Sequence, residues 1–364
     1  MKIGPAPSHV IKSRIKKLQR VMIEANAKSL LITQPENVQY VTGFNVVGNP
    51  PKNVWALVLE DREEAYLLVP PLEYYEALDE VKSAEIIQLN RKRRSIEAII
   101  DFLISIKVPI PLYVDDLYPQ DLIDAIRRKL ELHEVKALGQ EIENLRAKKD
   151  DYEISCIREA IEKTKRGLEK AHEVLCEGVR ETSIAAEIER ALREEDVEAM
   201  AFDIVVASGP RSSYPHAKPT SKRIKRGENV VIDLGVRVQG YCSDLTRTFI
   251  VGRNPEVEEK LSHVIAAQEE AIIHMKSGIK ASVIDEKARG YLKGKALDEH
   301  FLHGLGHGLG LSVHEKPTLS DLSEDILEKG NVITVEPGIY FRGRFGVRHE
   351  DVVLINDGGC IKLS

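Results

Sequence analysis

The sequence predicts an α+β protein of two domains, a smaller N-terminal α/β domain over residues 1–137 and a larger C-terminal domain over residues 138–364. Helix and strand patterns alternate as far as about Lys136, which is typical of an α/β unit. Beyond that point, β-branched runs separated by turns predict a hairpin. Two long amphipathic helices in the C-terminal part are each followed by a short segment of similar sequence, which indicates two related halves.

The N-terminal elements follow from apolar spacing and turn residues. Residues 13–25 have the spacing of an amphipathic helix, and the apolar run 29–33 predicts a strand. Residues 55–60 and 65–69 flank the charged turn 61–64 and predict a hairpin.

The C-terminal domain shows signs of an internal repeat. One long helix starts near Ile154 and ends before Gly178, and a second starts at Glu256 and ends before Gly278. Each glycine opens a similar phrase, Gly-Val-Arg-Glu-Thr-Ser-Ile and Gly-Ile-Lys-Ala-Ser-Val-Ile, and the two phrases are 100 residues apart. We therefore expect two copies of a helix–helix–strand unit with one site between them.

Composition limits the function classes. With 43% hydrophobic and 30% charged residues, the chain has the composition of a soluble globular protein, and its formal charge of −6 favours neither nucleic acid nor an anionic membrane as a partner. The basic run 222–226 is short and is interpreted as a solvated loop. The 4 cysteines form no close pair, and residues 1–7 carry no signal pattern, so we expect a cytoplasmic protein.

Asp233 and Asp244 lie in two β-branched runs joined by a short turn, which predicts a hairpin. A turn at Val238-Gln239 would place the two aspartates directly opposite, and a turn at Gln239-Gly240 would place them diagonally. In either register the carboxylates share one face, where two like charges disfavour ionisation unless a cation lies between them. The alternative, that each is a turn or strand-exit residue, explains one aspartate but not the pair.

The segment from His303 to His314 has a glycine at every second position between residues 304 and 310. A strand here would place His303 and His307 on one face and leave the other face bare, so that another strand or a ligand approaches closely. A helical zinc motif is rejected because each glycine would cost a helix roughly 1 kcal/mol. A lone histidine would be interpreted as a core residue, but three in one glycine-rich stretch favour a site.

Glu336 ends an apolar strand before a Pro-Gly turn, and Glu350 is expected within a further strand, on the same face as Arg348. A carboxylate in an apolar strand needs a partner. For Glu350, a structural salt bridge with Arg348 is the alternative to metal binding.

Together these residues form a hard, oxygen-rich ligand set. Four carboxylates and one imidazole suit Mn²⁺, Co²⁺ or Fe²⁺ at least as well as Zn²⁺, and four negative charges balance two dications. Paired ions of this kind activate water and polarise a carbonyl for hydrolysis. The ligand candidates are Asp233, Asp244, His307, Glu336 and Glu350.

The order of these ligands and the segments around them closely resemble the superfamily of prolidase, aminopeptidase P and methionine aminopeptidase. The segments are Val-Ile-Asp-Leu-Gly, Ser-Asp-Leu-Thr-Arg-Thr, His-Gly-Leu-Gly-His-Gly-Leu-Gly, Val-Glu-Pro-Gly-Ile-Tyr and Gly-Val-Arg-His-Glu-Asp. The resemblance is strong from about Leu145 to the end and weaker before it. It implies a pita-bread C-terminal domain with a curved antiparallel sheet, a creatinase-like N-terminal domain without catalytic ligands, and a homodimer.

By position, the resemblance implies that Asp233 and Asp244 bind one metal ion. Asp244, His307 and Glu336 would help to bind the other. Glu350 would bridge the two ions. Glu336 is also the expected general base.

The resemblance assigns further residues around the metals. His216 matches the histidine that stabilises the tetrahedral intermediate, and His314 matches one that contacts substrate and shuttles protons. His303 matches a histidine that lines the substrate pocket. Arg348 and Tyr340 are expected to orient the carboxylates, and we also place Arg348 among the substrate-binding residues; ordinary strand packing is the alternative for Tyr340.

One departure follows His216, where Ala217 stands at a position that is glycine in many relatives. This substitution leaves the chemistry of the motif intact and puts the local shape of the loop in doubt.

We therefore expect a metallopeptidase that hydrolyses the bond before proline, preferably in Xaa-Pro dipeptides, with two divalent ions per subunit. Mn²⁺ and Co²⁺ are expected first, and Fe²⁺ and Zn²⁺ also fit the ligands. The short chain and the segment His314–Pro317 favour a prolidase over an aminopeptidase P that acts on Xaa-Pro-Yaa peptides. Two further alternatives are a creatinase-like C–N hydrolase and a non-catalytic binding protein on the same fold; the complete ligand set disfavours both.

Overall fold

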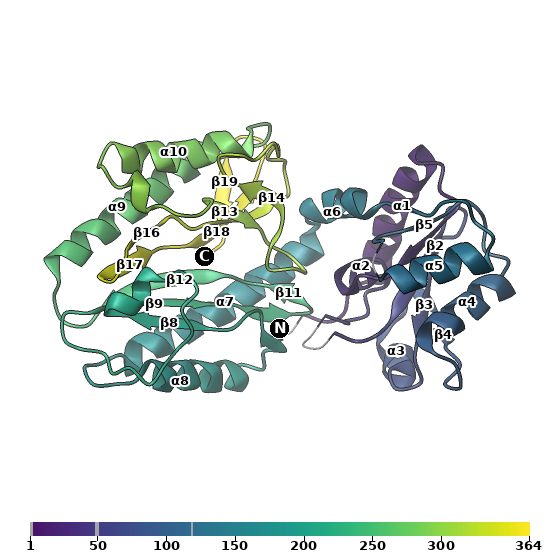
Figure 1. Cartoon of the computed structure of the whole chain (residues 1–364), viewed down its shortest axis with the longest axis horizontal. Coiled ribbons are helices and arrows are strands. Elements are labelled where there is room, and N and C mark those ends of the chain that lie inside the picture. Colours follow the sequence, from purple (N-terminus) through teal and green to yellow (C-terminus); the bar gives the residue numbers. More distant parts are fainter. Residues whose placement is uncertain (1–2, 48–50, 118) are drawn as a thin grey trace. The chain divides into compact units, whose positions relative to one another are not determined.

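The computed structural model describes residues 3–47, 51–117 and 119–364, and the chain divides into two compact units, Met1–Arg146 and Ala147–Ser364 (Figure 1). Residues 1–7 carry no signal pattern in the sequence, and the first two of these residues lie outside the described part. The division falls later than residue 137 because helix α6 (Gly139–Ala147) packs with the first unit. Ile142 of this helix is fully buried, and Arg146 donates a hydrogen bond of 3.0 Å to Asn37 Oδ1.

The first unit is built on a six-stranded mixed sheet in the order β4-β3-β2-β1-β5-β6. The hairpin expected over residues 55–69 is confirmed as the antiparallel pair β2–β3, in which Trp55 is opposite Leu68. The strands are β1 (Ser29–Ile32), β2 (Trp55–Leu59), β3 (Ala65–Val69), β4 (Ala84–Gln88), β5 (Leu112–Val114) and β6 (Lys136–Ala137). The helices before α6 are α1 (Ser8–Glu24), α2 (Pro35–Thr42), α3 (Tyr74–Glu80), α4 (Ser95–Ser105) and α5 (Gln120–Lys129).

The second unit contains two helix pairs that flank its strands. Helix α7 (Asp151–Val174) packs on α8 (Glu181–Glu194), and α9 (Pro255–Ile272) packs on α10 (Ala281–Lys293). Helix α7 begins at a capping box in which Asp150 and Glu153 each accept a hydrogen bond from the other's backbone N–H. In Figure 1 the α10 helix and the α8 helix lie on opposite sides of the strands.

The repeat expected from the sequence is confirmed in the backbone. Gly178 and Gly278 both have positive φ, +85° and +88°, a conformation that favours glycine. The amide of Gly178 donates to Ile224 O at 2.8 Å, and the amide of Gly278 donates to Leu327 O at 2.7 Å. Each phrase leads directly into the second helix of its pair, so the two halves have the same local construction.

The strand pairs described in the second unit are antiparallel, as expected for the resemblance. They form sheets in the orders β12-β9-β8, β14-β13-β15-β18-β19, β11-β10-β7 and β16-β17. The bounds are β7 (Ala199–Met200), β8 (Val205–Ser208), β9 (Asn229–Leu234), β10 (Val236–Val238), β11 (Tyr241–Cys242), β12 (Leu245–Ile250), β13 (Gly306–Gly308), β14 (Glu315–Leu319), β15 (Val332–Val335), β16 (Gly338–Phe341), β17 (Phe345–Arg348), β18 (Asp351–Ile355) and β19 (Cys360–Lys362). Two short 3₁₀ helices, Gly209–Ser213 and Asp298–His300, complete the unit.

The hairpin that carries the two aspartates adopts the diagonal register. Its turn residues Gln239 and Gly240 have positive φ, +50° and +77°, as a two-residue hairpin turn requires. Consequently Asp233 on β9 lies opposite Thr246 on β12, and Asp244 lies one residue before β12. Of the two registers open from the sequence, the turn geometry selects this one.

The glycine-rich segment is approached by protein backbone. A Cβ atom at Gly306 would lie 2.0 Å from Thr334 O, and one at Gly308 would lie 2.1 Å from Lys316 O. The neighbouring strands β15 and β14 therefore occupy the bare face, where a strand or a ligand was expected. The strand is shorter than the sequence suggested, because a shift in pairing between His307 and Gly308 interrupts the ladder.

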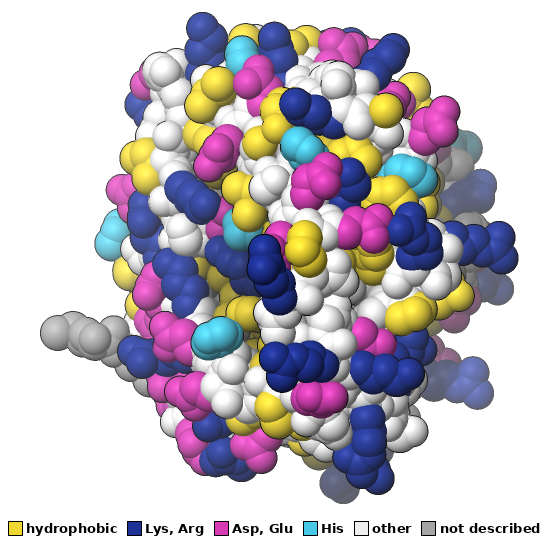
Figure 2. All heavy atoms as spheres, turned by 90° about the vertical axis from the view of Figure 1, so that its left-hand side faces the viewer, with side chains coloured by type: hydrophobic (Ala, Val, Ile, Leu, Met, Phe, Trp, Pro, Cys, Tyr) yellow, Lys and Arg dark blue, Asp and Glu magenta, His cyan; other side chains and the backbone are white. Residues whose placement is uncertain are grey.

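The molecular surface carries both signs of charge. On the face shown in Figure 2, lysine and arginine side chains alternate with aspartate and glutamate. Across the described residues, no helix has the length and apolar character that crossing a membrane requires. The four cysteines are free thiols, and two of them, Cys156 and Cys242, are buried.

Candidate metal centre

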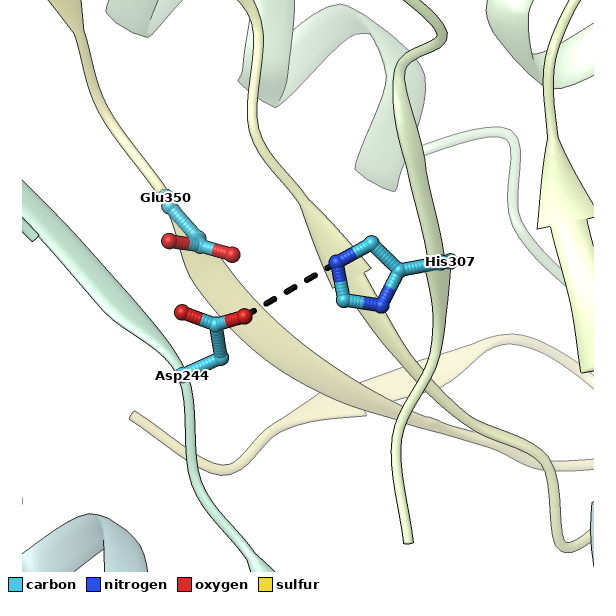
Figure 3. A group of neighbouring side chains, drawn as sticks. All are labelled: Asp244, His307 and Glu350. Carbon is cyan, nitrogen blue, oxygen red and sulfur yellow. Dashed lines mark ion pairs between the residues drawn. The ribbon is translucent and has the colours of Figure 1, made fainter. Parts of the chain in front are cut away.

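Three of the five ligand candidates form one cluster in the second unit. Asp244, His307 and Glu350 each offer a ligand atom, and these atoms lie within 4.8 Å of one another. Figure 3 shows the three side chains pointing toward one another from separate segments of the backbone. His307 Nε2 is 3.7 Å from Asp244 Oδ2. Residues that are far apart in the sequence therefore present an oxygen- and nitrogen-lined site for a cation.

The other two candidates extend this cluster. Glu336, in the turn between β15 and β16, has its Oε1 3.3 Å from His307 Nε2. Asp233 lies on β9, and its charge acts on both Asp244 and Glu350. Glu350 was expected within a strand, but it lies in the break between β17 and β18. The break turns its side chain to the site while Asp351 resumes the ladder opposite Val335.

The imidazole of His307 is oriented for ligation. Its Nδ1 is 3.1 Å from Gly308 O, so this nitrogen carries the proton and donates to the carbonyl. The lone pair on Nε2 then faces Asp244 and Glu336. A lone pair directed at carboxylate oxygens is repulsive unless a proton or a metal ion lies between them. Burial lowers the pKa of His307, but the hydrogen bond and charge of Glu336 outweigh it and raise that pKa.

The buried carboxylates repel one another, and a cation among them would relieve that repulsion. Burial, followed by the charges of Glu350 and Asp233, raises the pKa of Asp244 well above its usual value. Burial and the charges of Glu336 and Asp233 do the same to Glu350. Asp233 Oδ1 and Glu350 Oε1 are buried and accept no hydrogen bond within the described protein. Orphaned carboxylate oxygens among like charges fit divalent metal ions.

Addition of Mn²⁺ to the metal-free protein is expected to raise Tm, and to raise it more at pH 8 than at pH 5.5. At a concentration 100-fold above Kd, binding stabilises the folded state by about 2.7 kcal/mol. Protons compete for the same ligands, since the pKa values of Asp244, Glu350 and His307 are raised. Differential scanning fluorimetry at the two pH values measures the shift in Tm. The control is the metal-free protein in the same buffer without Mn²⁺. An equal shift at both would contradict the assignment.

Arg348 pairs with Asp233, not with Glu350 as one interpretation of the sequence proposed. Its NH2 group donates to Asp233 Oδ2 at 2.6 Å, and its Nε donates to Thr246 Oγ1 at 3.1 Å. The NH1 group donates to Tyr340 OH at 2.9 Å and to Pro215 O at 3.3 Å. All three guanidinium nitrogens are thus engaged and the side chain is 3% exposed. These contacts suit a residue that orients the site better than one that binds substrate.

Tyr340 and His303 continue the network away from Asp233. Burial lowers the pKa of His303, so its ring is neutral at physiological pH. Its Nδ1 donates to Gly304 O at 2.8 Å, and its Nε2 therefore accepts the hydrogen bond of 3.0 Å from Tyr340 OH. Burial also raises the pKa of Tyr340, which keeps the phenol protonated for this role. Tyr340 is a link in the network and not merely strand packing.

His314 and His216 are the two exposed histidines of the site. The ring of His314 stands edge-on to that of His307, with centroids 4.3 Å apart. Burial lowers the pKa of His314, and the charges of His307 and His216 lower it further. His216 lies in the loop after the 3₁₀ helix Gly209–Ser213 and also acts electrostatically on His303. The structure therefore brings all of the sequence-predicted residues into one neighbourhood.

Thr246, for which no role is expected from the sequence, lies at the centre of the network. This fully buried residue donates from Oγ1 to Glu350 Oε2 at 2.8 Å and accepts from Arg348 Nε. Through Arg348, it also connects the carboxylate of Glu350 with that of Asp233. A usable signal was present, because Thr246 is two residues after Asp244.

Two family models match the chain, one for each compact unit. Residues 155–357 match metallopeptidase family M24, and residues 14–148 match the creatinase/prolidase N-terminal domain. The second match extends through α6, in agreement with the packing of this helix on the first unit.

Full-length relatives are similar to the chain. It is 35% identical over 355 residues to the Xaa-Pro dipeptidase of Pyrococcus furiosus, covering 97% of this chain and 98% of the relative. The solved prolidase of Pyrococcus horikoshii OT3 has a TM-score of 0.87 and 34% identity, covering 96% of this chain and 97% of that one. An X-Pro aminopeptidase from Thermotoga maritima MSB8 has a TM-score of 0.86 and 32% identity, with the same coverage.

Proposed function

Because the chain belongs to metallopeptidase family M24, we propose that it hydrolyses the peptide bond before proline, preferably in Xaa-Pro dipeptides. The convergence of Asp244, His307 and Glu350 carries this proposal, since the same cluster supplies both a metal site and a neighbouring acidic group, Glu336. The likeness to Xaa-Pro dipeptidases over 97% of the chain supports the choice of substrate.

The ligands of the divalent ions would be Asp233, Asp244, His307, Glu336 and Glu350. When bound, the ions supply Lewis-acid polarisation of a carbonyl and make water more acidic. Glu336 is suited to accept a proton from that water. In the metal-free protein, burial raises the pKa of Glu336, but the hydrogen bond and charge of protonated His307 outweigh burial and lower it. With ions bound, their positive charge would keep the carboxylate ionised.

The exposed histidines would act on the substrate. His216 would donate a hydrogen bond to the carbonyl oxygen as it becomes negative. His314 has a lowered pKa and is neutral near pH 7, so it can accept and return a proton. His303 would line the pocket through its ring face, since both of its nitrogens are engaged by Gly304 and Tyr340.

A substrate panel tests this proposal. With Mn²⁺, we expect rapid cleavage of Met-Pro and Leu-Pro, and little cleavage of Xaa-Pro-Yaa tripeptides, of Met-Ala-Ser or of creatine. Repetition with Co²⁺ and Zn²⁺ identifies the preferred ion. Robust tripeptide cleavage without dipeptide cleavage would instead assign aminopeptidase P activity, which the likeness to the Thermotoga maritima enzyme makes the necessary comparison.

We further propose two ions per subunit, with Mn²⁺ or Co²⁺ before Fe²⁺ or Zn²⁺, because the ligands are mostly carboxylates. Metal analysis of the purified protein tests the stoichiometry, and a metal-free protein that metal does not activate would favour a binding role. A homodimer is proposed from the family resemblance and is tested by light scattering. A cytoplasmic location is proposed because the four cysteines are free thiols.

A further inference from the structure

A buried carboxylate outside the metal centre holds both ends of the loop that carries His216. Glu181, the first residue of α8, has a fully buried side chain. Its Oε1 accepts hydrogen bonds from the backbone amide and the hydroxyl of Ser208, at 2.8 Å and 2.7 Å. Its Oε2 accepts from the amide and the hydroxyl of Thr220, at 3.0 Å and 2.8 Å. Ser208 ends strand β8 and Thr220 lies after the loop, so one carboxylate closes residues 208–220 into a ring.

We call Glu181 and the groups that it binds, Ser208, Arg211 and Thr220, the clamp. The clamp includes a cross-link within the loop. Arg211 Nε donates to Glu181 Oε2 at 3.1 Å, and its NH2 group donates to Lys218 O, on the far side of His216. Lys222 Nζ donates to Ser208 Oγ at 2.7 Å, which directs the serine proton toward Glu181. Each part of the loop on either side of His216 is therefore tied, directly or through Arg211, to Glu181.

The loop is also tied to the strands that carry the candidate metal ligands. Before His216, Ser212 Oγ accepts from the amide of Gly346 at 2.8 Å and from Asn229 Nδ2 at 2.9 Å. Arg348 NH1 donates to Pro215 O, the carbonyl next to His216, and Arg348 NH2 binds Asp233. The Arg348–Pro215 bond is long, at 3.3 Å. At the other end of the loop, the amide of Thr182 donates to Thr220 O at 3.1 Å. Glu181 adds the side-chain contacts that join the beginning of the loop, at Ser208, to its end, at Thr220.

The chemistry of the clamp requires an ionised carboxylate. Burial raises the pKa of Glu181, but its hydrogen bonds with Ser208 and Thr220 lower it by more. Hydrogen bonds to a charged acceptor are shorter and stronger than neutral ones. A glutamine would present one donor to a cluster that consists of donors, so it would break the ring with almost no change in volume.

From these contacts we propose that Glu181 is a positioning residue for the reaction: it fixes the loop of residues 208–220 so that His216 faces the metal centre. The inference rests on the proposed peptidase function. The hydrogen-bond partners of Glu181 are Ser208, Arg211 and Thr220, none of which is a candidate metal ligand, so its effect on activity passes through His216.

The other half of the domain has a comparable device. Asp285, fully buried in α10, accepts from Arg289 Nε at 2.9 Å and from the amide of Leu305 at 3.0 Å. Arg289 NH2 in turn donates to His303 O at 3.0 Å. In each half, then, the second helix of the pair uses a buried carboxylate to hold a segment that carries a site histidine. A feature that occurs in both halves is better explained by positioning than by the packing of one loop.

A double-mutant cycle tests the proposal. We expect E181Q to lower kcat for Met-Pro by about 10–100-fold, the usual range for groups that orient reacting residues, with little change in KM. In the H216A background the same substitution is expected to lower kcat less than about twofold, because the group it positions is already absent. E187Q, which removes an exposed carboxylate from the same helix, is the matched control and should leave kcat unchanged.

A readout independent of catalysis accompanies the cycle. Hydrogen–deuterium exchange of residues 208–222 is expected to increase in E181Q and to stay at the wild-type level elsewhere in the second unit. If E181Q fails to fold, T220V removes a single hydroxyl from the clamp and should lower kcat in the same direction by a smaller factor. An equal fall in kcat for E181Q in both backgrounds, or unchanged exchange of the loop, would overturn the role of Glu181. A wild-type protein that cleaves no peptide would overturn the proposed function instead.

Discussion

Substitution of Asp244 by asparagine is expected to abolish the peptidase activity and to stabilise the metal-free protein. The loss of activity should be on the order of 1000-fold, or about 4 kcal/mol of transition-state stabilisation, because a ligand between His307 and Glu350 is lost. Without metal, the same change removes a buried charge that Glu350, Asp233 and Glu336 repel. Tm of the metal-free variant should therefore exceed that of the metal-free wild type at pH 7.5.

The sign of this effect depends on pH. The folded pKa of Asp244 lies above its unfolded value, so its contribution to stability is present below the unfolded pKa and is lost as the pH rises through the folded one. The difference in Tm between D244N and the wild type should grow from pH 4 toward neutrality. Thermal unfolding after EDTA treatment measures it, with D357N as a control at an exposed aspartate. A destabilised D244N at neutral pH would mean that Asp244 is held by attractive partners and not by a cation.

Substitution of Arg348 by methionine is expected to have the largest effect on stability. It leaves the carboxylate of Asp233 buried beside Tyr340 without its counter-ion, and breaking a buried pair in this way costs about 3–5 kcal/mol. Metal affinity should fall as well, because Asp233 and Thr246 lose the group that orients them. Denaturant unfolding and metal titration measure the two losses.

The control for this prediction is R237M. Arg237 is half-buried in the same unit, and its NH1 group donates to the carbonyls of Gly240 and Leu311. Substitution of Arg237 leaves no buried carboxylate without a counter-ion. The loss of unfolding free energy should therefore be clearly smaller than in R348M. R348K should recover part of the stability but little metal affinity, because an ammonium cannot reproduce the fork that reaches Asp233, Thr246 and Tyr340 together. Full recovery by lysine would show that only the charge matters.

Much of the candidate metal centre was predictable because its residues contradict their local context. An aspartate in a β-branched run or a glutamate at the end of an apolar strand needs a partner, and Asp233 and Glu336 stand out for this reason. The glycines around His307 likewise require a close neighbour, although the sequence left open whether it was a strand or a ligand. The division into two related halves followed from the phrases at Gly178 and Gly278, whose positive φ angles restrict the residue type.

Other features depend on contacts between residues that are far apart in the chain. The partner of Arg348 is Asp233, 115 residues away, although Glu350 is only two positions from it. Glu181 carries no local signal of its role, because a glutamate on a helix is ordinary until its burial and its partners are known. Thr246 is marked in the sequence only by its place two residues after Asp244. The register of the hairpin was decided by the backbone of Gln239 and Gly240.

The sequence by itself determined which side chains are chemically out of place, and hence the candidate ligand set, since burial of a charge is costly wherever it occurs. Only the tertiary structure decided which of those charges neutralise one another and which remain for a metal. Arg348 satisfies one oxygen of Asp233 and leaves the other bare, while Thr246 does the same for Glu350. Pairing of this kind depends on distances of a few ångströms between strands, and those distances are set by register and packing.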